Sequence, residues 1–240
     1  MKTEDNNTIL ISLITNVLLM FGKGITGLLA NSNALVADAV HSMTDVIFFF
    51  INYRACKECT AYACIDRKAK NQKHKEKIVK TEARASCITG IILLTIGMSI
   101  CFHNFMILVL DKAEKPDAVT VIVAFIALGV YGWLYKHVEE KDENGACILT
   151  TENTLWQNKV NLFSGLVVAV GLVGTLFGFV FMDEFAAIVV GSIILSMGIK
   201  LIFQAMNTYS AEINKRFKLV TVGCILVSII LTSISLSIQL

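Results

Sequence analysis

The sequence has little of what a water-soluble domain of its length needs. Of its 240 residues only 17% are charged and one is proline (Pro116), whereas 55% are hydrophobic and the mean hydropathy is +0.67. A soluble fold of this size requires a polar surface and turn-forming residues between its elements. These scarcities exclude a soluble domain and indicate a protein whose solvent is the lipid bilayer.

Apolar runs of about 20 residues, long enough to cross hydrocarbon, follow one another along the chain. We expect them to be helices, because open strands cannot pair their backbone groups in lipid and uninterrupted apolarity does not fit barrel strands. No cleavage-site pattern follows Met1–Thr8, so the first run is expected to be a retained membrane helix and not a signal peptide. The runs are Ile9–Ala30, Ala34–Tyr53, Ala83–Leu110, Ala118–Tyr135, Thr154–Met182, Phe185–Met206 and Leu219–Leu240.

Basic residues predict the orientation of these helices. The segment from Arg54 to Arg84 contains ten Lys and Arg residues against four acidic ones, an excess typical of cytosolic loops. The amino terminus then lies in the cytosol, and so do the Lys136–Ile148 loop and Lys215–Lys218. If the last run spans, Leu240 lies on the opposite side. The sequence therefore predicts an integral membrane protein with a cytosolic amino terminus, and we expect it in the cell (plasma) membrane.

Charge and cysteine content narrow the function further. The net charge of +2 conceals one basic loop between two membrane helices, which favours contact with anionic lipid over nucleic acid. A reducing cytosol argues against a disulfide framework for the seven cysteines. Cys56 and Cys59 have a spacing that could capture a soft metal, or they could be inert thiols. No nucleophile and base fall at a recognisable spacing, so we expect no enzymatic activity.

Three ionisable residues stand inside the second run, where such side chains are costly and usually functional. Asp38, His41 and Asp45 are spaced three and four apart, which places them within an arc of about 60° on one helix face. An imidazole and a carboxylate one turn apart suit Zn, Mn or Fe, with further ligands from a neighbouring helix. A buried His–Asp hydrogen bond that only joins helices is the structural alternative.

Polar residues also occur in the first and fifth runs. Lys23 could form an ion pair with Asp38, which favours a structural role for both residues. In the fifth run Asn153, Gln157 and Asn161 recur every four residues and give one face a row of amides. Amide oxygens are acceptable ligands for hard cations but carry no charge, so ligation and interhelical hydrogen bonding remain equally open.

The first two runs resemble the cation diffusion facilitator family. The pattern N-x2-L-x4-K-x3-G is met by Asn16, Leu19, the neighbouring Gly22-Lys23 and Gly27. The pattern S-x-A-L-x-A-D-A-x-H-S-x-x-D is met from Ser32 to Asp45, and Ser164-Gly165 also resembles the family. The resemblance covers about residues 9–210.

The resemblance implies an all-α membrane bundle that exports a divalent metal ion in exchange for protons, usually as a homodimer. His41 and Asp45 correspond to the family's ligands on helix two, whereas Asp38 is not usually a direct ligand. Gln157 and Asn161 stand where helix five of the family offers His or Asp. We therefore expect a site of His41, Asp45, Gln157 and Asn161, with Asp38, Lys23, Asn153, Cys56 and Cys59 as accessory residues. No cofactor is implied beyond the transported Zn, Fe or Mn ion.

The sequence also departs from the family. The amides at Gln157 and Asn161 remove charge from helix five. No soluble domain like the family's follows residue 210, so we expect a transmembrane domain over 1–210 and, over 211–240, a basic linker with a seventh helix. These departures favour one rival reading, a family member that does not transport and serves as a partner or assembly subunit.

Overall fold

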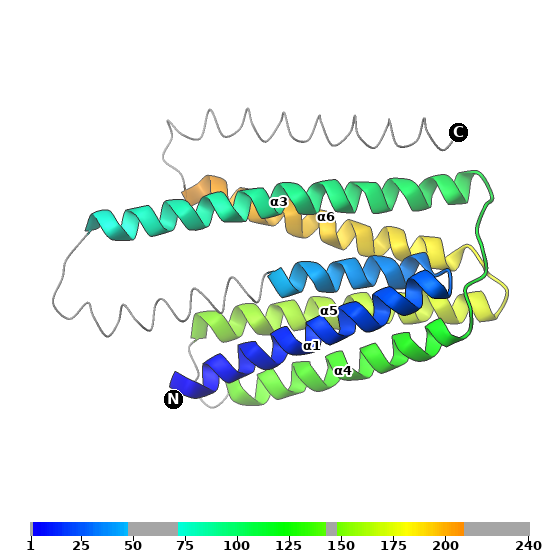
Figure 1. Cartoon of the computed structure of the whole chain (residues 1–240), viewed down its shortest axis with the longest axis horizontal. Helices are drawn as coiled ribbons and strands as arrows, with labels where there is room; N and C mark the ends of the chain where they lie inside the picture. Colours follow the sequence, from blue (N-terminus) through cyan, green and yellow to red (C-terminus); the bar gives the residue numbers. More distant parts are fainter. Residues whose placement is uncertain (1, 48–71, 143–147, 209–240) are drawn as a thin grey trace. The chain divides into compact units, whose positions relative to one another are not determined.

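A computed structural model describes residues 2–47, 72–142 and 148–208 (Figure 1). Every regular element in these ranges is a helix: α1 (Lys2–Leu29), a helix over residues 33–47 that Figure 1 leaves unlabelled, α3 (Gln72–Val109), α4 (Val119–Asp142), α5 (Ile148–Leu176) and α6 (Met182–Thr208). The predicted all-α membrane bundle is thereby confirmed. The predicted seventh helix and Cys56 and Cys59 lie outside the described residues.

Five of the labelled helices are long and apolar enough to cross a membrane. Their candidate spans run over Leu10–Leu29, Cys87–Val109, Val119–Glu139, Leu155–Leu176 and Met182–Phe203. The helix over 33–47 corresponds to the described part of the second predicted run. α3 begins well before its apolar segment, because the sequence from Gln72 onward continues in good helix formers.

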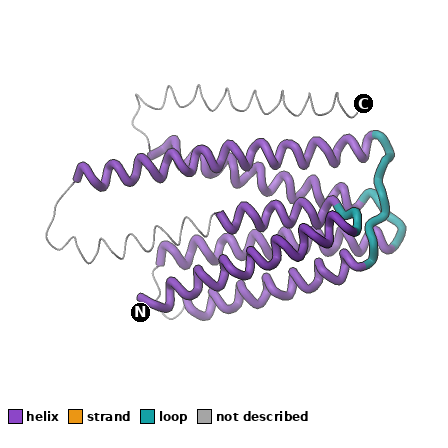
Figure 2. Tube along the Cα trace, in the orientation of Figure 1, coloured by secondary structure: helices purple, strands orange, loops and turns teal. Residues whose placement is uncertain are grey.

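The helices group into two compact units. The first contains α1, the helix over 33–47, α4, α5 and α6 as far as Val190, and the second contains α3 to Met106 with α6 from Gly191 onward. In the first unit α1, α4 and α5 lie side by side (Figure 1), and the connections that follow α1, α3 and α5 gather at one end (Figure 2). We call this the loop end of the unit.

Glycines bring the two helices of the second unit into backbone contact. A Cβ atom added to Gly90 would lie 2.9 Å from the Gly198 carbonyl oxygen, and one added to Gly97 would lie 2.9 Å from that of Gly191. Both helices thus place glycines seven residues apart on the contacting faces. Small residues at such spacing allow membrane helices to approach closely.

The turn between α5 and α6 corrects one predicted boundary. The apolar run from Thr154 to Met182 reads as one helix, but α5 ends at Leu176. Gly178 has a φ of 96°, a conformation that favours glycine, and the Phe179 amide donates to the Gly174 carbonyl in the terminating turn. Gly178 therefore closes a turn and does not pack against a neighbouring helix.

Candidate metal centre

A tight hairpin joins α1 to the helix over 33–47 and fixes their relative register. α1 ends at Leu29 and is followed by a left-handed Asn31, with φ of 53°, and the Ser32 amide donates to the Gly27 carbonyl. The Ser32 hydroxyl then accepts the Leu35 amide at 3.1 Å and caps the next helix. A Cβ on Gly27 would lie 2.9 Å from the Val36 nitrogen, so glycine permits the close approach.

The loop end of this hairpin is held by a carboxylate from α6. Asp183 accepts hydrogen bonds from the Ser32 hydroxyl at 2.8 Å and from the Asn33 backbone amide at 2.6 Å. The first amides of a helix have no partners within the helix and carry partial positive charge, so an anion there is stabilising. Asp183 is fully buried. It therefore fastens α6 to the start of the helix that carries His41 and Asp45.

Lys23 is the centre of a buried polar network in the middle of the first unit. Its Nζ lies 2.9 Å from Asp38 Oδ2, 2.5 Å from the Ser42 hydroxyl and 2.7 Å from the Tyr131 hydroxyl. The ion pair expected from the sequence is therefore present, and both of its side chains are nearly inaccessible to solvent. A buried pair is tolerated when further hydrogen bonds satisfy its remaining donors and acceptors, as they do here.

Asp38 is also held from the opposite side. The Ser164 hydroxyl of α5 donates to Asp38 Oδ1 at 2.8 Å, so each carboxylate oxygen has a partner. The pair of Lys23 and Asp38 carries no net charge. Asp38 is therefore engaged in structural contacts through both of its oxygens.

A second contact joins the same two helices closer to the carboxyl end of the 33–47 segment. Gln157 Nε2 donates a hydrogen bond to Asp45 Oδ1. This contact lies seven residues from the Ser164–Asp38 contact on both helices, in opposite chain directions. The helices are therefore antiparallel with a constant register over about 10 Å.

That register places the remaining two predicted ligands at one depth. His41 is four residues from Asp45, and Asn161 is four residues from Gln157, so both lie between the two contacts. All four residues are buried. The structure thus gathers His41, Asp45, Gln157 and Asn161 in the interior of the first unit.

Several polar atoms of this group have no hydrogen-bond partner in the described part of the chain. They are both ring nitrogens of His41, Oδ2 of Asp45 and both amide atoms of Asn161, all of them buried. Such atoms are costly unless water, an ion or another ligand satisfies them. One imidazole, one carboxylate and neutral amides can coordinate a divalent cation. In contrast, the neighbouring Lys23 network is satisfied within the protein.

The side chains of the other predicted accessory residues, Asn153, Cys56 and Cys59, are not described by the structure. The backbone of Asn153 lies in α5. Among the described residues no three His, Cys, Asp or Glu side chains come together as a metal cluster. Any cation held here therefore depends on amide groups as well as on His41 and Asp45.

Sequence reasoning missed three residues of this region. Tyr131 could not be recognised as a site residue from the sequence, because a single tyrosine in an apolar run is ordinary. Asp183 stands at the edge of a run, where a carboxylate usually meets water. Asn158 is fully buried with both amide atoms unpartnered, yet it falls outside the four-residue repeat of its neighbours.

These features define a polytopic helical membrane protein with a polar, partly unsatisfied interior. A family model described as the cation efflux transmembrane domain matches residues 9–209. The chain belongs to this family, the cation diffusion facilitators, as the motifs on the first two helices predicted.

Curated relatives agree with this assignment. The chain is 27% identical over 187 residues to magnetosome protein MamB of Magnetospira sp. (strain QH-2), an alignment covering 77% of this chain and 60% of MamB. It is 27% identical over 212 residues to metal tolerance protein C1 of Arabidopsis thaliana, covering 79% and 42% of the two chains. It is 24% identical over 229 residues to manganese efflux system protein MneP of Bacillus subtilis (strain 168), covering 90% and 73%. The chain thus spans about half the length of the first two relatives.

Proposed function

We propose that this protein exports a divalent metal cation through a site formed by His41, Asp45, Gln157 and Asn161. The observation that carries the proposal is a set of buried atoms on His41, Asp45 and Asn161 that have no hydrogen-bond partner among the described residues and lie within about one helical turn of depth. A dication would satisfy the oxygens of Asp45 and Asn161 and one imidazole nitrogen of His41, whereas a purely structural cluster would pair these atoms with one another, as the Lys23 network does.

The donor set favours a hard or borderline ion. One imidazole and one carboxylate suit Zn or Fe, and neutral amide oxygens shift the preference toward Mn. The relative named as a manganese efflux system protein supports Mn as the first metal to test. The ion is the transported substrate and not a resident cofactor, and we assign the chain no catalytic activity.

Proton exchange by alternating access completes the proposal. Coordination of a cation by a ring nitrogen of His41 requires that nitrogen to carry no proton. Entry of the metal would therefore displace a proton.

We further propose a homodimer in the plasma membrane with the amino terminus in the cytosol. The basic loop supports that orientation, and the exposed apolar side chains along α1, among them Leu18 and Phe21, suit contact with lipid.

Flux through reconstituted vesicles tests the transport function. Purified protein in sealed vesicles should move Mn²⁺, Zn²⁺ or Fe²⁺ inward or outward along an imposed gradient, and an opposing pH gradient should change the rate. Co²⁺ and Cd²⁺ complete the series. A chain that moves none of the five ions, while remaining folded and inserted, would contradict export.

A non-transporting partner subunit is the second candidate function. The neutral amides at Gln157 and Asn161 favour it, because they bind a dication more weakly than carboxylates do. Expression in cells that lack their own exporter separates the two functions. Restored metal resistance supports transport, whereas a partner subunit would restore resistance only together with an active transporter.

A further inference from the structure

The first unit is built in layers that repeat every seven residues. In one layer Lys23 of α1 contacts Asp38 and Tyr131, and a Cβ on Gly165 of α5 would lie 3.4 Å from the Tyr131 ring. We call this the lysine layer. It contains one position from each of four helices, so it fixes their relative depths at a single level.

A second layer lies two turns away, toward the end of the unit where α1 begins. Seven residues from the lysine layer stand Asn16 on α1, Asp45 on the 33–47 helix, Val138 on α4 and Asn158 on α5. Neighbouring helices run in opposite directions, so a shift of seven residues moves each by the same depth, about 10 Å. Residues seven apart also share a helix face to within about 20°. All four side chains are buried.

Unpartnered atoms distinguish the two layers. The polar contacts of the lysine layer satisfy Lys23 and both oxygens of Asp38. In the second layer Asn16 Oδ1, Asp45 Oδ2 and both amide atoms of Asn158 are buried and have no hydrogen-bond partner among residues 2–47, 72–142 and 148–208. Three oxygens from three helices, one of them charged, are therefore left without a proton donor at a single depth.

We propose that Asn16, Asp45 and Asn158 form an oxygen-donor tier that holds a divalent cation with part of its water shell. The inference rests on the proposed function and extends the site by two residues, Asn16 and Asn158. The tier lies about one turn from the depth of His41, on the side where α1 begins, which the basic loops predict to be cytosolic. Asp45 contributes a ligand both to the tier and to the site at His41. The ion can therefore pass from one to the other while it stays bound to Asp45.

The chemistry of the tier gives it a metal preference. It offers oxygens and one negative charge but no imidazole, a donor set that suits hard ions such as Mn²⁺, which keep bound water readily. The level of His41 instead offers an imidazole, which suits Zn²⁺. Removing a ligand at the tier or at the level of His41 should therefore change the affinities for Mn²⁺ and Zn²⁺ differently.

Binding of Mn²⁺ and Zn²⁺ to the purified full chain in detergent, measured by calorimetry, tests the tier. Asn158→Leu and Asn16→Leu should each weaken Mn²⁺ binding about tenfold and Zn²⁺ binding by much less. His41→Ala should show the reverse preference. Asn158→Asp, which adds charge to the tier, should strengthen Mn²⁺ binding, and it decides the matter if either leucine variant fails to fold.

Asn104 supplies a matched control. Like Asn16, it is a buried helix residue whose Nδ2 donates to the carbonyl four residues earlier and whose Oδ1 is unpartnered, but it lies on α3 in the other unit. One free oxygen is thus not sufficient for a site, and Asn104→Leu should leave both metal affinities unchanged. Tier variants that match Asn104→Leu, or that weaken both metals equally, would overturn the tier.

Two results with Asp45→Ala distinguish an error in the proposed tier from an error in the proposed transport function. If Asp45→Ala abolishes binding while the Asn16 and Asn158 variants bind as the parent does, the tier is wrong and the site at His41 stands. If Asp45→Ala binds and transports as the parent does, the metal site itself is wrong and the tier falls with it.

Discussion

Lys23 Nζ and Asp38 Oδ2 lie 2.9 Å apart in the interior of the first unit, with both side chains almost completely buried. Their partners Ser42, Tyr131 and Ser164 come from three further positions in the sequence, so one ion pair fixes four helices at a common depth. The pair is neutral as a whole. It leaves Asp45 as the carboxylate that faces unpartnered groups.

We expect Lys23→Met to destabilise the folded protein by about 3–5 kcal/mol, because the Asp38 charge would remain buried without its partner. Thermal unfolding in detergent measures the effect. The double variant Lys23→Met with Asp38→Asn should recover most of the loss, since no charge then remains unpaired. Equal destabilisation by the single and the double variant would contradict this explanation.

Asp45→Ala should abolish metal flux in vesicles and leave membrane insertion intact. The substitution removes the carboxylate of the proposed site, and it also removes the cost of placing that group in the bilayer. Asp117→Ala is a suitable control, because Asp117 is an exposed carboxylate in the connection before α4. Transport by the Asp45 variant at the parental rate would place the site elsewhere.

Asn161→Asp should increase metal affinity, alone or together with Gln157→His. Asn161 lies at the depth of His41 with both amide atoms unpartnered, and an added anion facing a dication strengthens binding. Calorimetry with Mn²⁺ and Zn²⁺ provides the measurement. Lys159→Glu is the control for added negative charge, since Lys159 is exposed on another face of α5. Unchanged affinity in Asn161→Asp would show that α5 does not contribute a ligand.

Asp183→Ala should destabilise the start of the helix over 33–47 by about 1–3 kcal/mol. The change leaves the Ser32 hydroxyl and the Asn33 amide without their acceptor at the positive end of that helix. Amide hydrogen exchange at residues 33–36 should rise more than exchange in the middle of α4. No local increase would mean that Ser32 alone caps the helix.

Much of this architecture could be predicted from the sequence, because charged residues in apolar runs are conspicuous. Asp38, His41 and Asp45 fall on one face by spacing alone, and Lys23 was the available cation for Asp38. The depth of Asn161 relative to His41 could not be predicted, because it depends on two contacts between helices that are distant in sequence. Asp183 was missed for the same reason, since its partners lie about 150 residues away.

The end of α5 was missed for a different reason. The segment from Phe177 to Phe181 is as apolar as the helices on either side, and hydropathy does not distinguish a lipid-compatible turn from a helix. Only the glycine at position 178 marks it. A glycine in an apolar run can serve in a turn or in helix packing, and no neighbouring residue distinguishes the two uses here.

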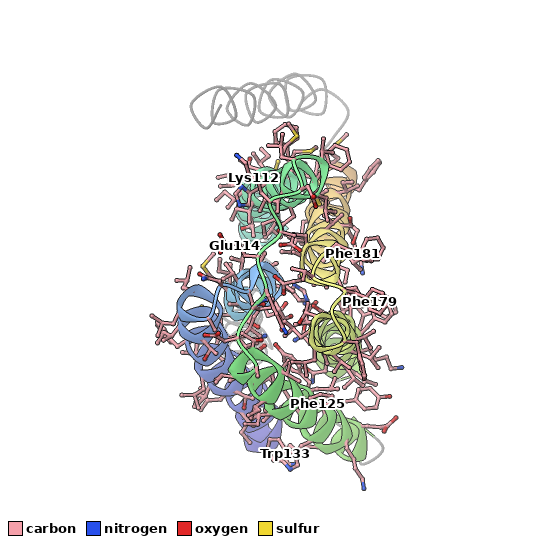
Figure 3. All side chains as sticks on the ribbon, turned by 90° about the vertical axis from the view of Figure 1, so that its right-hand side faces the viewer. Lys112, Glu114, Phe125, Trp133, Phe179 and Phe181 are labelled. Carbon is pink, nitrogen blue, oxygen red and sulfur yellow. The ribbon has the colours of Figure 1, made fainter. Side chains whose placement is uncertain are left out.

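The turn between α5 and α6 should differ from the connection between α3 and α4 in its accessibility to reagents. Phe177, Phe179 and Phe181 are each at least half exposed, and Phe179 and Phe181 point outward, whereas the connection between α3 and α4 presents the charged Lys112 and Glu114 (Figure 3). Aromatic side chains favour the membrane interface, and charged ones favour water. Proteases, antibodies and impermeant labels should therefore reach residues 110–118 and leave 177–181 untouched. An epitope inserted between α5 and α6 would not be labelled in an accessibility experiment, although this connection and the one between α3 and α4 lie at the same end of the unit.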